Sequence, residues 1–163
     1  MAKKWLVIFT AGLLMGYGVH AYAQEKNQPS EGMTVQDFLK EALSIVGLVN
    51  SLSEEDAYEK IKSTADIVII DVGEENEFKA EHLDNAILIP RGLLEMKIGK
   101  NDIFPEINKG VTPNKNQPIL LYCKVGARSL LAAATLKKMG YKNIYHLKGG
   151  LEAWKSANLP LAK

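Results

Sequence analysis

Apolar residues along the chain fall into short continuous runs that alternate with segments of helical periodicity. The runs cover residues 66–72, 86–90, 119–123 and 143–147. The first is rich in β-branched residues, and continuous runs of this kind are typical of strands that are buried on both faces. We therefore predict that these runs form the strands of one parallel sheet.

The segments between the runs carry helix signals. Ser53 and the three acidic residues after it predict a helix that ends near residue 63, because carboxylates favour a helix N-terminus. Further helices are predicted over residues 75–82, 92–98, 127–139 and 151–157. Strands that alternate with helices favour an α/β fold, with a small parallel sheet, right-handed crossovers and helices on both faces.

The first 23 residues differ from the rest of the chain. Lys3 and Lys4 precede an uncharged apolar stretch over residues 5–19, and a small-x-small pattern ends at Ala23. This arrangement is typical of a secretory signal peptide, and its apolar stretch is short for a membrane span. We expect cleavage at residue 23, export to the periplasm and no membrane span in the mature chain; an uncleaved N-terminal anchor is the alternative.

Residues 24–51 are predicted to form a polar leader and an additional helix. Thr34 is placed to cap this helix, whose apolar residues recur at helical spacing up to residue 50. Residues 52–163 then make one domain that is long enough to bury a core.

Charge and composition narrow the class of partner. The 20 basic and 19 acidic residues are interspersed and give a net charge of +1, so nothing indicates binding to nucleic acid. No spacing of histidine, cysteine or carboxylate residues supports a metal site, and we expect no cofactor.

Candidate chemistry centres on the only cysteine of the chain, Cys123, which ends the third apolar run. Cysteines of exported proteins are usually paired, but one cysteine cannot form an internal disulfide. Cys123 is therefore buried and inert, paired between molecules, or reactive. Ligands of open parallel sheets bind beyond the carboxyl ends of the strands, where we expect both Cys123 and Asp71.

The loop after Cys123 has the properties of an anion cradle. It runs directly into a helix, whose unpaired N–H groups and dipole stabilise a thiolate at that point. Gly126 permits a tight turn, and Arg128 adds a permanent charge and a forked donor. Cys123 is therefore predicted to be a nucleophile.

These segments resemble a rhodanese domain, the single-domain sulfurtransferase family. Residues 120–154 are similar to its C-terminal half and residues 67–96 to its N-terminal half. The motifs that carry the resemblance are Cys-x-x-Gly-x-Arg-Ser at Cys123, Gly-Tyr at Gly140, and Gly-Gly-x-x-x-Trp ending at Trp154. The resemblance spans about residues 52–157 and implies a rhodanese-like three-layer fold.

The resemblance also implies an activity and a set of site residues. Cys123 would take sulfane sulfur from thiosulfate or another small sulfur-containing anion, hold it as a persulfide, and pass it to a thiol, a cyanide-like acceptor or a protein acceptor. Asp71 and Arg91 are candidates for supporting the pocket. The substrate-binding loop would comprise Lys124, Val125, Gly126, Ala127, Arg128 and Ser129.

Two features bear on the alternatives. The loop from Cys123 to Arg128 has six residues. The resemblance implies that this length favours sulfur transfer over phosphate hydrolysis, because related phosphatases of the same fold have a loop that is one residue longer. Gly73 stands where the family usually has arginine, and residues 81–86 depart from the usual Gly-His-Ile-Pro-Gly-Ala. A non-enzymatic sulfur carrier or protein-binding module is therefore the second hypothesis, and a phosphatase the third.

Overall fold

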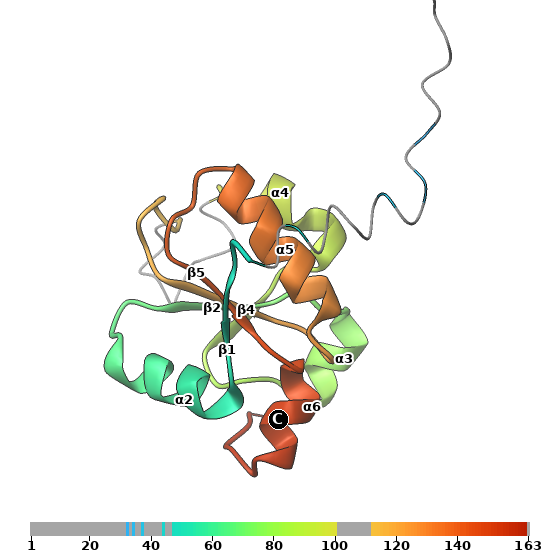
Figure 1. Ribbon diagram of the computed structural model, residues 1–163. Helices are drawn as coiled ribbons and strands as arrows, with labels where there is room; N and C mark the ends of the chain where they lie inside the picture. The colour runs from blue at the N-terminus through green and yellow to red at the C-terminus, as the bar shows by residue number, and fades with distance from the viewer. Residues whose placement is uncertain are drawn as a thin grey trace, which may run out of the picture. The chain divides into compact units, whose positions relative to one another are not determined.

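The computed structural model describes Gly32, Thr34, Asp37, Ser44 and residues 47–100 and 112–162. The predicted signal peptide and most of the predicted leader helix lie outside these residues. Residues 34–163 belong to one compact unit, in which a central sheet is covered by helices (Figure 1).

The elements alternate between strand and helix through most of this unit. In chain order they are β1 (Asn50–Leu52), α2 (Glu54–Ser63), β2 (Val68–Asp71), α3 (Glu75–Ala80), β3 (Ala86–Leu88), the 3-10 helix η1 (Arg91–Leu93), α4 (Leu94–Lys97), β4 (Ile119–Tyr122), α5 (Ala127–Lys138), β5 (Ile144–Leu147) and α6 (Gly150–Ser156).

All neighbouring strands of the sheet are parallel, in the order β1-β5-β4-β2-β3. The chain leaves β2 toward β3 on one side, whereas it leaves β4 toward β5 on the other. The carboxyl ends of β2 and β4 therefore flank the point where the strand order reverses, which is where open parallel sheets form a binding crevice. Asp71 and Tyr122, the last residues of these strands, are register partners.

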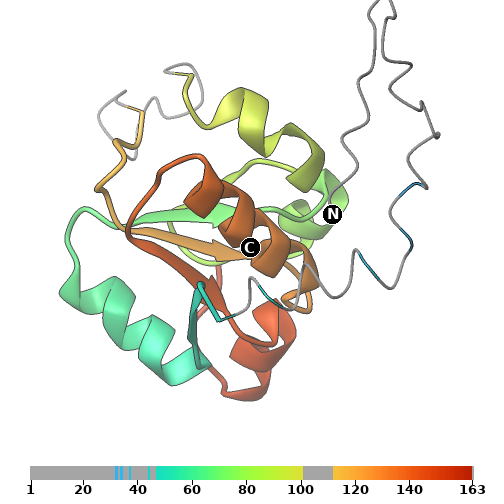
Figure 2. The ribbon, with the colours of Figure 1, turned by 45° about the horizontal axis from the view of Figure 1, so that its top comes forward.

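The core is divided by the sheet into two apolar layers. Alternate residues of β4 enter opposite layers: Ile119 and Leu121 pack with α4 and α5, whereas Leu120 and Tyr122 pack with α2 and α6. Figure 2 shows helices on both faces of the sheet. The predicted parallel α/β architecture is thus confirmed.

The predicted leader helix ends earlier than expected, and the strand β1 was not predicted. The leader helix was expected to continue to residue 50, but a turn begins at Gly47 and β1 follows at Asn50. At the described positions of the leader, the Asp37 N–H donates to Thr34 Oγ1 at 3.1 Å, as expected of a cap. β1 pairs with β5 through its backbone, so its three residues need no apolar pattern.

Helix α2 begins where the sequence predicts, because Ser53 caps it. The Ser53 hydroxyl accepts a hydrogen bond from the Asp56 N–H at 3.1 Å, which satisfies one of the unpaired donors of the first turn. Within the part of the chain that the structure describes, no helix is long and apolar enough to cross a membrane.

Ser53→Ala is expected to lower the free energy of unfolding by about 1 kcal/mol, because it removes this cap. Ser51→Ala is the matched control, since Ser51 is exposed in β1, and its effect should stay within about 0.5 kcal/mol. Urea denaturation measures both values. Equal losses in the two variants would contradict the capping role of Ser53.

Candidate active site

Cys123 lies at the junction between β4 and the loop that leads into α5. It is fully buried, and its Sγ accepts a hydrogen bond from the Gly126 N–H at 3.2 Å. The sulfur therefore lies beside the positive end of a twelve-residue helix. The structure brings Cys123 and the predicted loop together as an anion cradle.

Gly126 forms the N-cap of α5 in a left-handed conformation, with φ of +90°. Its carbonyl accepts a hydrogen bond from the Ser129 hydroxyl at 3.0 Å, and that hydroxyl also lies 3.0 Å from Nδ1 of His146. A serine hydroxyl has one hydrogen, so while Ser129 donates to Gly126, the Nδ1–H of His146 donates to Ser129. Burial lowers the pKa of His146 to about 4, so this brace is neutral near pH 7.

The first turn of α6 binds the outer side of the same loop. The Leu151 N–H donates to the Cys123 carbonyl at 2.9 Å, and the Glu152 N–H donates to the Lys124 carbonyl at 3.0 Å. Gly150 permits this approach, because a Cβ there would lie 2.2 Å from the Cys123 carbonyl oxygen. Gly150 thus allows α6 to hold the backbone of Cys123 and Lys124 in place.

Arg128 projects from the first turn of α5 and is paired with α3. Its Nη2 donates to Glu77 Oε2 at 2.6 Å, and its Nη1 lies 3.6 Å from Glu74 Oε1. Burial opposes the charge of Arg128, but its interactions with Glu77 and Cys123 raise the pKa of the guanidinium. Arg128 is therefore a cation beside the thiol.

Asp71 is buried at the end of β2, on the neighbouring strand. It accepts hydrogen bonds from the Gly73 N–H, at 2.7 Å, and from the hydroxyl of Tyr122. The Tyr122 hydroxyl in turn accepts from the Leu83 N–H at 3.1 Å. Burial raises the pKa of Asp71 above its ordinary value, against these hydrogen bonds. Asp71 thereby links the loop after β2 to the end of β4 and, through Tyr122, to the segment before β3.

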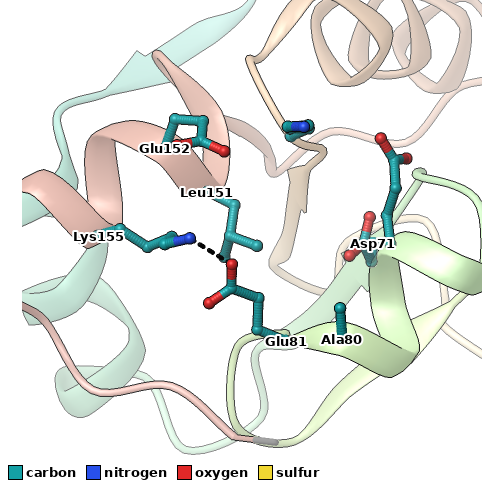
Figure 3. Close-up of a pocket in the computed structure, with 8 residues that line it drawn as sticks. Asp71, Ala80, Glu81, Leu151, Glu152 and Lys155 are labelled. Atoms are coloured by element: carbon teal, nitrogen blue, oxygen red, sulfur yellow. Dashed lines mark hydrogen bonds and ion pairs between the residues drawn. The ribbon is translucent and has the colours of Figure 1, made fainter.

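A pocket of about 250 Å³ opens beside the loop. In Figure 3, Glu81, which directly follows α3, and Lys155 of α6 meet across it and form an ion pair. Its lining residues are Asp71, Glu77, Ala80, Glu81, Lys124, Leu151, Glu152 and Lys155. Because the Leu151 N–H also donates to the Cys123 carbonyl, the pocket adjoins the loop that carries Cys123.

The remaining predicted site residues occupy different places. Lys124 lines the pocket, whereas the side chains of Val125 and Ala127 are exposed on the loop. Arg91 is not among the residues that line this pocket. It donates to Glu95 at 2.7 Å and to Thr135 of α5 at 3.0 Å, so it ties the segment after β3 to α5.

Three residues near the site have roles that the sequence analysis did not predict. Glu77 and His146 contact the loop from α3 and β5, and nothing in the chain places either of them beside Cys123. Gly150 belongs to the Gly-Gly-x-x-x-Trp motif, but the motif alone did not predict its close contact with the loop. All three act through tertiary contacts.

Known proteins share the sequence pattern of this chain. The Rhodanese-like domain family matches residues 53–157. The chain belongs to the rhodanese-like family. Among its relatives, the thiosulfate sulfurtransferase GlpE of Coxiella burnetii is 32% identical over 109 residues, covering 67% of this chain and 90% of that protein.

Solved structures of similar fold include a sulfur transferase and a protein of unestablished function. The polysulfide-sulfur transferase homodimer of Wolinella succinogenes is 27% identical with a TM-score of 0.57, covering 78% of this chain and 88% of its own. RPA3614 of Rhodopseudomonas palustris, a protein of unknown function described as a possible tyrosine phosphatase, is 30% identical with a TM-score of 0.62, covering 79% and 94%. A rhodanese-related protein of Thermoplasma volcanium is 26% identical with a TM-score of 0.55, covering 69% of this chain and 97% of its own. The fold is therefore that of rhodanese-like proteins.

Gly150→Ala is expected to destabilise the protein by roughly 3 kcal/mol or more, because overpacking against the loop adds to the strain of a positive φ. Gly140→Ala is the matched control: Gly140 also has a positive φ, of +89°, but a Cβ there meets nothing within 4 Å. It should cost about 1–2 kcal/mol. Urea denaturation of both variants measures this difference, and equal losses would contradict the proposed close packing.

His146→Asn is expected to reduce the loss of stability in acid. The pKa of His146 is about 4 in the folded protein and 6.5 as the ordinary value. The unfolded chain therefore binds more protons between these values, and the folded state loses about 2–3 kcal/mol as the pH falls through this window. Asparagine can still donate to Ser129 but does not titrate.

The measurement is the free energy of unfolding of wild type and His146→Asn at pH 7 and at pH 4.5. The wild type should lose more stability than the variant between the two pH values. Parallel losses would show that His146 is not buried in its neutral form.

Proposed function

We propose that the protein is a sulfurtransferase that moves sulfane sulfur from thiosulfate or a similar donor to a thiophilic acceptor by double displacement. The observation that carries this proposal is the position of Cys123. Its Sγ accepts from the Gly126 N–H at 3.2 Å at the N-terminus of α5, beside the Arg128 guanidinium. Membership of a family whose named relatives are sulfurtransferases supports it.

In the first half-reaction, the Cys123 thiolate attacks the outer sulfur of the donor. The S–S bond of the donor breaks, and the leaving group departs with the electron pair, as sulfite in the case of thiosulfate. Cys123 then carries a persulfide. Splitting the transfer into two displacements is ordinary covalent catalysis.

In the second half-reaction, the acceptor attacks the outer sulfur of the persulfide. Cyanide would leave as thiocyanate, and a thiol would leave as a persulfide, while the Cys123 thiolate is restored. The N–H groups at the start of α5 suit both anionic forms of the sulfur, because the helix dipole and the Gly126 N–H favour negative charge at this point.

Full burial of Cys123 means that neighbouring side chains move before a donor reaches the sulfur. The donor would approach through the pocket, because one of its lining residues, Lys124, belongs to the loop and another, Leu151, binds the loop. Arg128 is the cation within reach of an anionic donor, and Lys124 adds a second positive charge at the mouth.

Export to the periplasm is part of this proposal. The two lysines, the apolar stretch over residues 5–19 and the small residues up to Ala23 support it. The intact mass of the protein recovered from the periplasmic fraction of its host tests it: a chain that begins at residue 24 supports cleavage, and a full-length chain in the membrane fraction contradicts it.

A phosphatase is the second candidate, favoured by the description of RPA3614. The six-residue loop from Cys123 to Arg128 argues against it, since the resemblance to rhodanese domains implies that a shorter loop suits a sulfur atom better than a phosphate group. A non-enzymatic sulfur carrier is the remaining alternative. It is distinguished from an enzyme by the rate at which the sulfur-loaded protein passes its sulfur to a small acceptor.

Cys123→Ser is expected to abolish sulfur loading, because a hydroxyl without a neighbouring base is a poor nucleophile. The measurement is the intact mass after incubation with polysulfide. Wild type should gain the mass of one sulfur atom and lose it on addition of cyanide, with release of thiocyanate over many turnovers. A single release would indicate a carrier, and Cys123-dependent hydrolysis of an aryl phosphate without sulfur loading would contradict the proposal.

A further inference from the structure

The positive charge of Arg128, which would bind an anionic donor, is already paired with carboxylates in the protein. Arg128 binds Glu77 at 2.6 Å, and its second terminal nitrogen lies 3.6 Å from Glu74. The side chains of Arg128 and Glu77 are both about 30% exposed, so water screens this pair only partly. A donor anion therefore competes with a carboxylate for the guanidinium.

Glu77 is held in this position by its own helix as well as by Arg128. Its Oε2 accepts the Glu74 N–H at 2.9 Å, as in a capping box. This backbone hydrogen bond lowers the pKa of Glu77, and Arg128 and Lys124 lower it further against the effect of burial. Glu77 is thus an anion near pH 7.

Gly73 leaves room for this arrangement. A Cβ at this position would lie 2.8 Å from Asp71 Oδ1 and 3.0 Å from Glu77 Oε2. A larger residue would therefore force one of these carboxylates to move. The absence of a side chain at Gly73 allows the carboxylates of Asp71 and Glu77 to lie close together near Arg128.

The residues that line the pocket also carry more negative than positive charge. Four of its eight lining residues are acidic and two are lysines. Of the two lysines, Lys155 is paired with Glu81 (Figure 3). The pocket therefore offers a dianion little uncompensated positive charge.

We propose that Glu77 is a specificity-determining residue that selects sulfur donors carrying one negative charge over dianions such as thiosulfate. This inference rests on the proposed sulfurtransferase function and deepens it. The donor class is a monoanionic sulfane compound, for which alkyl persulfides and alkanethiosulfonates are examples. Glu77 acts through repulsion of the donor and through its hold on Arg128.

Thiosulfate and methanethiosulfonate form a matched pair of donors for this question. In methanethiosulfonate a methyl group replaces one oxygen of thiosulfate, so its charge is −1 rather than −2. The thiolate of Cys123 attacks the outer sulfur of either compound and the S–S bond breaks, so that sulfite or methanesulfinate leaves with the electron pair. Both reactions give the same persulfide, and the donors differ chiefly in charge.

Glu77→Gln is the decisive variant. Glutamine keeps the shape of the side chain and can still accept the Glu74 N–H, as capping boxes allow, but it carries no charge. Glu75→Gln is the matched control on the same helix, because the Glu75 side chain is 69% exposed and pairs with Lys79, away from Arg128. Thermal denaturation of both variants checks that the fold is retained.

The experiment measures kcat/KM for each donor with cyanide as the acceptor and thiocyanate as the product. In a double-displacement reaction this constant reports only the first half-reaction, in which the donor is consumed. The ratio of kcat/KM for thiosulfate to that for methanethiosulfonate is expected to rise about tenfold or more in Glu77→Gln. The same ratio should not change in Glu75→Gln.

The outcomes separate this inference from the proposed function. Thiocyanate formation with a ratio that stays within twofold of wild type in Glu77→Gln would overturn the selection by charge and leave sulfur transfer standing. An equal rise in Glu75→Gln would also overturn it, because the effect would then belong to net charge. No thiocyanate from either donor with any variant would overturn the proposed function, and this inference with it.

Discussion

The close approach of α6 to the loop after β4 is the contact on which the site depends. Two carbonyl groups of the loop, those of Cys123 and Lys124, accept N–H groups from the first turn of α6. In a trans peptide the carbonyl and the following N–H point in opposite directions, so this contact turns the loop's next N–H groups away from α6. Gly150 makes it possible because it has no Cβ.

A second brace holds the same loop from the sheet side. Ser129 donates to the Gly126 carbonyl and is itself held by His146, and Gly126 in turn donates its N–H to the sulfur. Because His146 is buried and neutral near pH 7, this brace adds no charge to the site. The electrostatics around the thiol are therefore set by α5, Arg128 and the carboxylates of α3, rather than by an acid or base within the loop.

The sequence predicted the arrangement of Cys123 and its loop because both lie in one contiguous segment. The apolar run, Cys123, Gly126 and the helix that follows dictate a strand, a tight turn and a helix N-terminus in that order. Glu77 and His146 reach the loop from elements that are distant in the chain, so only the packing of the sheet places them. β1 was missed for a related reason: backbone pairing with β5, not an apolar pattern, makes it a strand.

The element that pairs with Arg128 is only loosely tied to the core. Helix α3 has six residues, and none of them is buried. Short elements with few buried apolar contacts open most readily, whereas β4 and the inner face of α5 are fully packed. Release of Arg128 from Glu77 therefore needs no movement of the loop around Cys123. Displacement of α3, or of the Glu77 side chain alone, frees Arg128 while Gly126 and α6 keep the cradle in place.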